Sequence, residues 1–297
     1  MVRYILMVLG GAVSFGILSS FVKLAYQHGY NTAQISFLQA LIGAIVLWIV
    51  FVISKRPAAS RKQVPLLLMT GATIGVATFL YYLSVKFIPA SVAIVLLMQF
   101  TWIGILIEWI FFKKKPSLTE LFIAAVILSG TIMASGSSLA GGMSLSVKGV
   151  LIVLAASLVY AAYIVANSRI GRDICWQNKS AWIMTGAAAA IWMMNIKSVN
   201  VHLLMEMDLL RWCIFLAFFG TILPPILFAI GIPKVGATVS SLLMTVELPV
   251  AALSAHFILG EQITELQLAG IAIMLVAIMS MNFIRSARQK KEMAATA

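Results

Sequence analysis

Residues 235–257 read VGATVSSLLMTVELPVAALSAHF, and this stretch decides the class of fold. It is long enough to cross a bilayer, since about 20 apolar residues span the hydrocarbon core as a helix. Only Glu247 and His256 interrupt it. The rest of the chain has the same character, because 62% of its 297 residues are hydrophobic and 10% are charged. A soluble domain could not cover its surface with so few charges, so the bilayer is the expected solvent.

Charged residues divide the chain into apolar segments of membrane-spanning length. Ten such segments are expected, at residues 4–22, 32–53, 64–85, 87–107, 121–147, 149–168, 180–196, 212–233, 235–257 and 266–284. The first is too long for a signal peptide and has no small-residue cleavage site, so we predict that it stays as a mature helix. The expected fold is therefore an all-α polytopic membrane protein with ten transmembrane helices.

The basic residues predict the orientation. With the N-terminus inside, sixteen of the 21 Lys and Arg residues lie on the cytoplasmic side, and five lie outside. The five outer residues are Lys23, Lys86, Lys148, Lys197 and Arg211. The positive-inside rule then places both termini in the cytoplasm and the chain in the cytoplasmic membrane. The net charge of +12 becomes an insertion signal that contacts anionic lipid headgroups, and no nucleic-acid partner is expected.

Short motifs recur in the same order in the two halves of the chain. The Leu-Leu-Met of residues 96–98 returns at residues 242–244, and a Gly/Ser-rich junction lies at residues 135–146. The predicted halves are residues 1–140 and 141–297, with five spans each. Because five is odd, the second half is expected to be inverted relative to the first. Inverted repeats place a substrate site at the midplane between the halves and allow alternating access.

The stretch from Glu247 to Glu261, followed by Thr264 and Gly270, resembles the ninth-to-tenth-helix signature of the drug/metabolite transporter superfamily. Within that superfamily, the chain resembles the EamA-type proteins, which have ten helices in two EamA repeats. The resemblance implies a secondary transporter, usually an exporter of small metabolites such as amino acids. One departure is Leu248, which separates Glu247 from the proline that follows it directly in many relatives.

Glu247 is the candidate that stands out, because it lies near the middle of an apolar span. An intramembrane carboxylate is costly unless it is paired or protonated, and such groups are functional by default. A group of this kind can bind and release a proton, or act as the counter-charge for a substrate ammonium group. The alternative is a structural carboxylate that is hydrogen-bonded to a neighbouring helix.

Other polar and aromatic residues lie at mid-span. Gln99 and Trp102 share one helical face at a spacing of three, which suits either a small amphipathic ligand or helix packing. The remaining candidates for a substrate site are Tyr82, Tyr160, Tyr163 and Asn167. Glu108 lies close to the inner surface, so we expect it to pair with the lysines at residues 113–115. The pair Pro224-Pro225 is expected to kink the eighth span.

The most favoured function is a secondary transporter that moves a small polar or amphipathic metabolite outward by alternating access. Proton coupling and facilitated diffusion both remain open. No Walker sequence, metal-ligand spacing or catalytic motif occurs, so no enzyme activity, cofactor or metal is expected. Cys175 and Cys213 fall on opposite sides of the membrane and are not expected to pair. The expected partners are a small-molecule substrate and the lipid bilayer, with a monomer as the working state. The alternatives are a non-transporting membrane partner or scaffold subunit, and an intramembrane enzyme.

Overall fold

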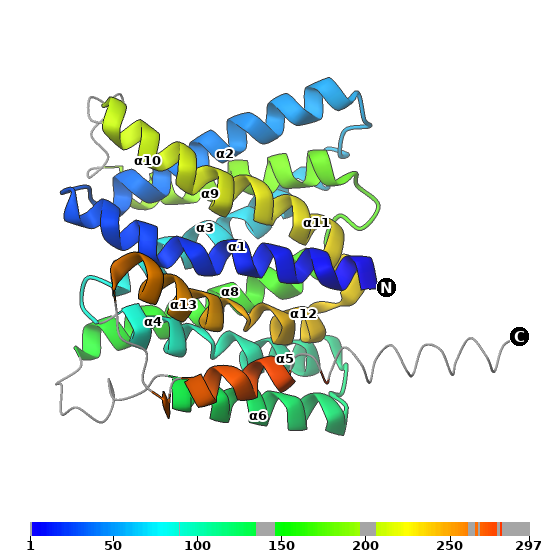
Figure 1. Cartoon of the computed structure of the whole chain (residues 1–297). Helices are drawn as coiled ribbons and strands as arrows, with labels where there is room; N and C mark the ends of the chain where they lie inside the picture. The colour runs from blue at the N-terminus through cyan, green and yellow to red at the C-terminus, as the bar shows by residue number, and fades with distance from the viewer. Residues whose placement is uncertain are drawn as a thin grey trace, which may run out of the picture.

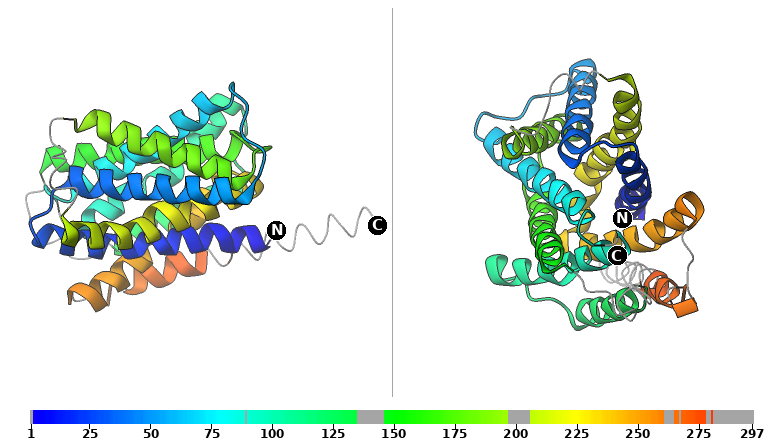
Figure 2. Two further views of the ribbon diagram at one scale, coloured as in Figure 1. Left: turned by 90° about the horizontal axis from the view of Figure 1, so that it is seen from above. Right: turned by 90° about the vertical axis from the view of Figure 1, so that its left-hand side faces the viewer.

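The computed structural model describes residues 2–88, 90–134, 146–196, 206–260, 265–266, 268–277 and 280. Within these ranges the regular secondary structure is entirely helical. The long helices lie side by side in one bundle, as Figure 1 shows. Figure 2 shows the same bundle from above and from one end, where the helix axes point along the line of sight.

Helical segments account for most of each half. The first half holds α1 (Val2–Gln27), α2 (Thr32–Ser54), α3 (Val64–Ser84), α4 (Ala90–Leu97), α5 (Phe100–Phe112) and α6 (Leu118–Ala134). The second half holds α8 (Val147–Arg169), α9 (Trp176–Met194), α10 (Met207–Ala217), the π-helix η2 (Phe218–Ile222), α11 (Leu223–Val235), α12 (Ala237–Met244) and α13 (Glu247–Leu259). Local sequence explains some of these starts. Asn31 and Gln34 form a capping box at α2, and Ser117 and Glu120 exchange the same bonds at α6.

Seven helical segments in the described part of the chain are long and apolar enough to cross a membrane. Two further apolar helices, Leu118–Met133 and Leu268–Ala277, are shorter. Helix α9 is 19 residues long but is not among the seven, since its first turn carries Gln177, Asn178 and Lys179. The chain is a multi-pass membrane protein, and the full count of ten spans stays a prediction.

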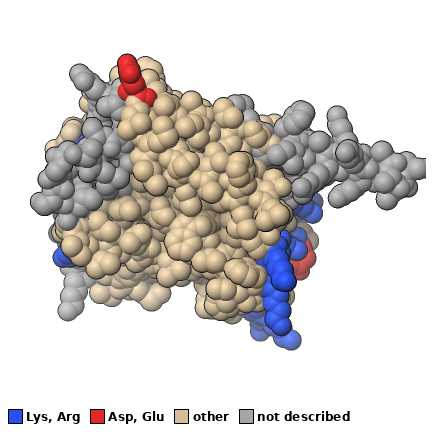
Figure 3. Space-filling view, turned by 90° about the horizontal axis from the view of Figure 1, so that it is seen from below, with Lys and Arg blue, Asp and Glu red and all other residues tan. Residues whose placement is uncertain are grey.

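Charged side chains lie at the two ends of the bundle. On the face shown in Figure 3, the middle of the molecule is free of charged residues. Most of the Lys and Arg residues visible there gather at the end where α1 begins. This arrangement is typical of a protein whose central belt contacts lipid tails and whose ends contact headgroups and water.

The two halves run through the bundle in opposite directions. Helix α1 ends where α3 ends, since the Tyr26 hydroxyl donates to the Tyr82 carbonyl over 3.2 Å. Helix α8 begins at this same end, because Gly149 in its first turn packs against Phe87 and Ile88, just after α3. The first helix of the second half therefore starts where the first helix of the first half finishes, as an inverted repeat requires.

One tightened turn interrupts the fourth span of each half. Helix α4 ends at Leu97 and α5 begins at Phe100, while α12 ends at Met244 and α13 begins at Glu247. In both turns, backbone N–H groups donate to the carbonyl three residues earlier, from Gln99 to Leu96 and from Val246 to Leu243. A mid-helix turn of this 3₁₀ type is often a hinge. Neither turn contains a proline, so hydropathy and proline positions do not reveal them.

The span that comprises α10, η2 and α11 has an irregular centre as well. The π-helix η2 comes directly before Pro224 and Pro225, whose nitrogens cannot donate a hydrogen bond. A kink is expected from this proline pair, and the structure has a widened, π-helical turn just before it. A neighbouring helix binds one of the freed carbonyls, since the Ser14 hydroxyl of α1 donates to the Phe219 carbonyl in η2.

Two glycines allow α3 and α9 to cross in close contact. A Cβ atom at Gly71 would overlap the backbone carbonyl of Ile183, and one at Gly186 would overlap the carbonyl of Leu68. Small residues of this kind let membrane helices approach backbone to backbone. This crossing joins a helix of the first half to a helix of the second.

Gly71→Ala is expected to lower the free energy of unfolding by about 1–3 kcal/mol, because the added methyl group has no space between the two backbones. The measurement is the midpoint of thermal unfolding in detergent. Gly104→Ala is the matched control, since a Cβ there meets only Ser241, at 3.7 Å. Equal midpoints for the two variants would contradict the close crossing.

Candidate functional site

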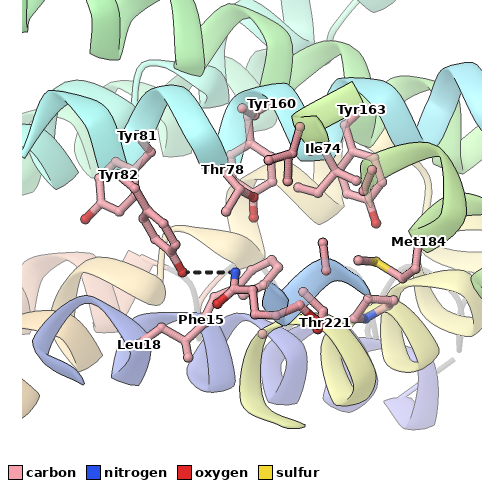
Figure 4. Close-up of a pocket in the computed structure, with 18 of the residues that line it drawn as sticks. Phe15, Leu18, Ile74, Thr78, Tyr81, Tyr82, Tyr160, Tyr163, Met184 and Thr221 are labelled. Atoms are coloured by element: carbon pink, nitrogen blue, oxygen red, sulfur yellow. Dashed lines mark hydrogen bonds between the residues drawn. The ribbon is translucent and has the colours of Figure 1, made fainter. Parts of the chain in front are cut away.

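A cavity lies between the two halves, near the middle of the bundle. Its wall is formed by Phe15, Leu18, Gln39, Ala40, Ile74, Gly75, Ala77, Thr78, Tyr81, Tyr82, Ile94 and Leu97 from the first half, and by Tyr160, Tyr163, Met184, Ala187, Ile191, Gly220, Thr221, Pro225 and Glu247 from the second. The free space is about 70 Å³, which is room for a few water molecules. Most of the wall is apolar and aromatic, with a few polar groups, as is typical of small-molecule sites. Figure 4 shows several of these side chains facing one another across the space.

Glu247 is the charged residue of this wall. It is the first residue of α13, directly after the tightened turn, and 3% of its surface is exposed. Its carboxylate accepts a hydrogen bond from the Tyr160 hydroxyl over 2.7 Å. The turn in the ninth span thus places a carboxylate at a half-helix end that faces the cavity.

Aromatic rings surround this carboxylate. The Tyr160 ring packs edge-on against Phe100, with 4.9 Å between the ring centroids. It lies parallel to the Tyr163 ring, with the centroids 6.2 Å apart. The Tyr163 hydroxyl accepts a hydrogen bond from the Asn167 amide over 3.2 Å. Tyr160, Tyr163 and Asn167 therefore form one polar row along α8, with Glu247 at one end.

Gln39 and Tyr82 supply the polar groups on the other side of the cavity. The Gln39 amide nitrogen donates to the Tyr82 hydroxyl over 3.4 Å, which Figure 4 marks as a dashed line. The Gln39 backbone carbonyl accepts from the Thr221 hydroxyl over 2.7 Å. Two buried atoms of the residues that line the cavity have no hydrogen-bond partner among the described residues, the Gln39 amide oxygen and the Tyr81 hydroxyl.

Five of the seven predicted site residues either line the cavity or bind a residue that lines it. Tyr82, Tyr160, Tyr163 and Glu247 line the cavity. Asn167 contacts it through Tyr163.

Gln99 and Trp102 do not line the cavity. They share a helical face as expected, and the Trp102 indole donates to the Gln99 amide oxygen over 2.8 Å. That face is directed away from the cavity, however, and 39% of the Trp102 surface is exposed.

Gln39, Tyr81 and Thr221 belong to the cavity but were not expected from the sequence. A signal for Gln39 was available, since it is a polar residue inside the apolar segment of residues 32–53. Tyr81 precedes a predicted residue, but its side-chain direction depends on how α3 packs. Thr221 lies in η2, and nothing in the sequence locates a π turn.

A second buried carboxylate, Glu108, ties the halves together at one end of the bundle. Only 2% of its surface is exposed. It accepts bonds from Lys114 over 3.0 Å, from Arg169 over 2.8 Å and from the Thr238 hydroxyl over 2.6 Å. The predicted pairing with a nearby lysine is present, whereas the partners from α8 and α12 were not foreseen. We call Glu108, Lys114, Arg169 and Thr238 the ionic cluster.

The ionic cluster lies deeper toward the end where α1 begins than the cavity does. Thr238 and Glu247 are nine residues apart in one span, which corresponds to about 14 Å along a helix. The cluster joins α5 of the first half to α8 and α12 of the second. We expect this contact to close the path between the halves at this end of the bundle.

No group of three His, Cys, Asp or Glu side chains that could hold a metal ion occurs among the described residues. Cys175 and Cys213 are both free thiols. His202 and Glu261 lie outside the described residues, as do Pro89 and Thr264.

Glu108→Gln is expected to open the closed end, because it removes the charge that holds Arg169 and Lys114. Lys114 and Arg169 then lose their counter-charge, and both side chains can turn toward water, since they are 50% and 31% exposed. A cysteine that replaces the buried Ser240, in a chain with Cys175 and Cys213 changed to Ser, should react with a water-soluble maleimide about tenfold faster.

Asp208→Asn is the control for this experiment. Its carboxylate pairs with Arg211 in an exposed contact at the opposite end, so its loss should leave the maleimide rate unchanged. An unchanged rate in Glu108→Gln as well would contradict the closing role of the ionic cluster.

Long apolar helices, two opposed halves and a cavity between them are features expected of the class of membrane transport proteins. The comparison with known families agrees, since the model of the EamA-like transporter family matches residues 2–136 and 147–283. The chain belongs to this family, and the two matched segments are its two repeats.

Individual relatives support the same assignment. The chain is 24% identical over 292 residues to a protein of Bacillus subtilis (strain 168) named "Uncharacterized transporter YcbK", an alignment that covers 95% of this chain and 93% of the relative. A solved structure titled "Crystal structure of protein" has a TM-score of 0.69 at 15% identity and covers 91% of this chain and 94% of its own. At that identity the structure supports the fold alone.

Proposed function

We propose that this protein is a secondary transporter that exports a small polar or amphipathic metabolite by alternating access between its inverted halves. The observation that carries the proposal is the cavity lined by both halves, with a buried carboxylate at the break of a membrane-spanning helix. Discontinuous helices at the midplane are typical of secondary-transporter binding sites. The proposed arrangement has ten spans, both termini in the cytoplasm, and a monomer in the cytoplasmic membrane.

The cavity as it stands is narrow, so transport requires the halves to move. Its free space of about 70 Å³ holds a few water molecules, and the ionic cluster ties the halves together at one end. The tightened turns before Phe100 and Glu247, together with η2, supply places where the helices can bend. In the proposed cycle, the ionic cluster separates when the cavity opens toward the cytoplasm, and it re-forms when the cavity opens outward.

Glu247 is the proposed coupling residue. It is buried, it has one neutral hydrogen-bond partner in Tyr160, and it lies on the path between the two access states. A carboxylate in such surroundings can take up a proton when the substrate leaves and release it when the substrate binds. Proton-driven exchange follows if the two binding events exclude each other.

The substrate can be identified by comparing cells that express the protein with cells that lack it. Metabolites are compared inside and outside cells with and without the protein, and the compound that changes most is tested directly in proteoliposomes. Export predicts a lower intracellular level of that compound in cells that express the protein.

Glu247→Gln is expected to reduce the initial rate of proton-driven transport of that compound by about tenfold or more, because the amide keeps the shape but cannot carry the proton. An imposed pH gradient should accelerate the wild-type protein and have no effect on the variant. Asp208→Asn, which removes an exposed carboxylate, should behave as wild type.

Normal transport by Glu247→Gln with an unchanged pH profile would overturn the coupling role. Full tolerance of Glu247→Leu, with no metabolite affected by the protein, would point to a non-transporting partner or scaffold subunit instead.

A further inference from the structure

We infer that the cavity recognises an organic amine, with a cationic ammonium head and an apolar body, and rejects molecules that carry a carboxylate. The inference rests on the proposed transport function and specifies the chemical class of its substrate. It is argued from the charge of the cavity wall, from its unpaired hydrogen-bonding atoms and from its aromatic surface.

The wall carries a negative group and lacks a positive one. Glu247 is its carboxylate, and there is no Lys, Arg or His among the described residues that line the cavity. Two cations of α8 and α9 are engaged elsewhere, since Lys179 donates to the Asn167 carbonyl over 2.8 Å and Arg169 binds Glu108. A substrate carboxylate would therefore lose its hydration and find no counter-charge in the cavity, which is strongly unfavourable at low dielectric.

The unpaired atoms of the wall need hydrogen-bond donors. The Gln39 amide oxygen can only accept, and it is buried without a partner. The Tyr81 hydroxyl is also buried without a partner and can accept. An ammonium group offers three N–H donors and no acceptor, whereas a carboxylate offers acceptors alone. Filling such unsatisfied positions with charge-assisted hydrogen bonds gives the strongest polar contacts that this wall can make.

The remaining surface suits a cation with an apolar body. The rings of Phe15, Tyr81, Tyr82, Tyr160 and Tyr163 line the space, and aromatic faces attract ammonium groups. The Tyr160 ring lies parallel to the Tyr163 ring and carries the hydroxyl that binds the Glu247 carboxylate, so an ammonium group at this carboxylate would lie near an aromatic ring. Aliphatic residues complete the wall, namely Ile74, Ile94, Leu97, Met184 and Ile191.

Three compounds with one phenyl body test the inference. Phenethylamine carries only the ammonium, phenylalanine carries both charges, and phenylpropionate carries only the carboxylate. Binding to the purified full-length protein in nanodiscs is measured by isothermal titration calorimetry at one fixed pH. Phenethylamine should bind about tenfold more tightly than phenylalanine and still more tightly than phenylpropionate, because only the amine leaves no charge unpaired.

Two variants test whether phenethylamine binds inside the cavity. Glu247→Gln, which keeps the hydrogen bond from Tyr160, should weaken phenethylamine binding by about tenfold or more, and Gln39→Leu should weaken it by a smaller factor. The exposed Asp208→Asn is the matched control and should bind as wild type. Circular dichroism and thermal unfolding confirm that each variant is folded before its binding is compared.

Equal or tighter binding of phenylalanine or phenylpropionate overturns the inference, as does the absence of phenethylamine binding or a full response in Glu247→Gln. These results leave the proposed transporter standing if the expression experiment identifies a transported metabolite. Absence of any transported metabolite overturns transport itself, whichever compound binds.

Discussion

A peptide group inside hydrocarbon must find its hydrogen-bond partner within the protein, since no water is present there to provide one. This constraint decides where the helices of this bundle can break. Irregular backbone occurs in the turns before Phe100 and Glu247 and in η2, each covered by neighbouring helices. Side chains meet part of the demand, as where the Ser14 hydroxyl binds a carbonyl of η2. Glu247 and two residues of η2 line the same cavity, so broken backbone and buried polar groups gather in one place.

The same constraint explains why two buried carboxylates have different roles. Glu108 accepts bonds from two cations and a hydroxyl, which compensate its charge within the protein. Glu247 has a single neutral donor in Tyr160 and an open side toward the cavity. A fully paired carboxylate stabilises one arrangement of the halves, whereas an incompletely paired one can respond to a proton or a ligand. The difference in partners, rather than in burial, separates a structural acid from a candidate functional one.

Sequence patterns located much of this architecture because hydropathy is a strong signal. The lengths of the apolar segments and the positions of the charged residues predicted a multi-pass helical bundle. The repeated motif predicted that the chain consists of two related repeats. Partners far apart in the chain were harder to foresee, as with Glu108 and Arg169, because nothing local connects them. The face of a helix beyond a break was also missed. Gln99 and Trp102 follow the expected spacing, but the tightened turn before Phe100 redirects that segment, and their face lies away from the cavity.

The two halves have similar backbone breaks but differ in the charged residues beside them, and this difference matters for the proposed mechanism. Helices α5 and α13 both begin after a tightened turn, yet the first residue of one is Phe100 and that of the other is Glu247. By the spacing that relates the Leu-Leu-Met of residues 96–98 to that of residues 242–244, Glu108 corresponds to Ser254, whose hydroxyl bonds the Ser20 hydroxyl and a carbonyl of α1. The contact of the first half therefore includes ion pairs, whereas its counterpart consists of neutral hydrogen bonds, which are weaker. In the proposed cycle, similar hinges in both halves would make the two access states geometrically alike, while the unequal contacts would give them different energies. A substrate or proton at the Glu247 carboxylate would then shift a balance that the repeated backbone alone would leave even.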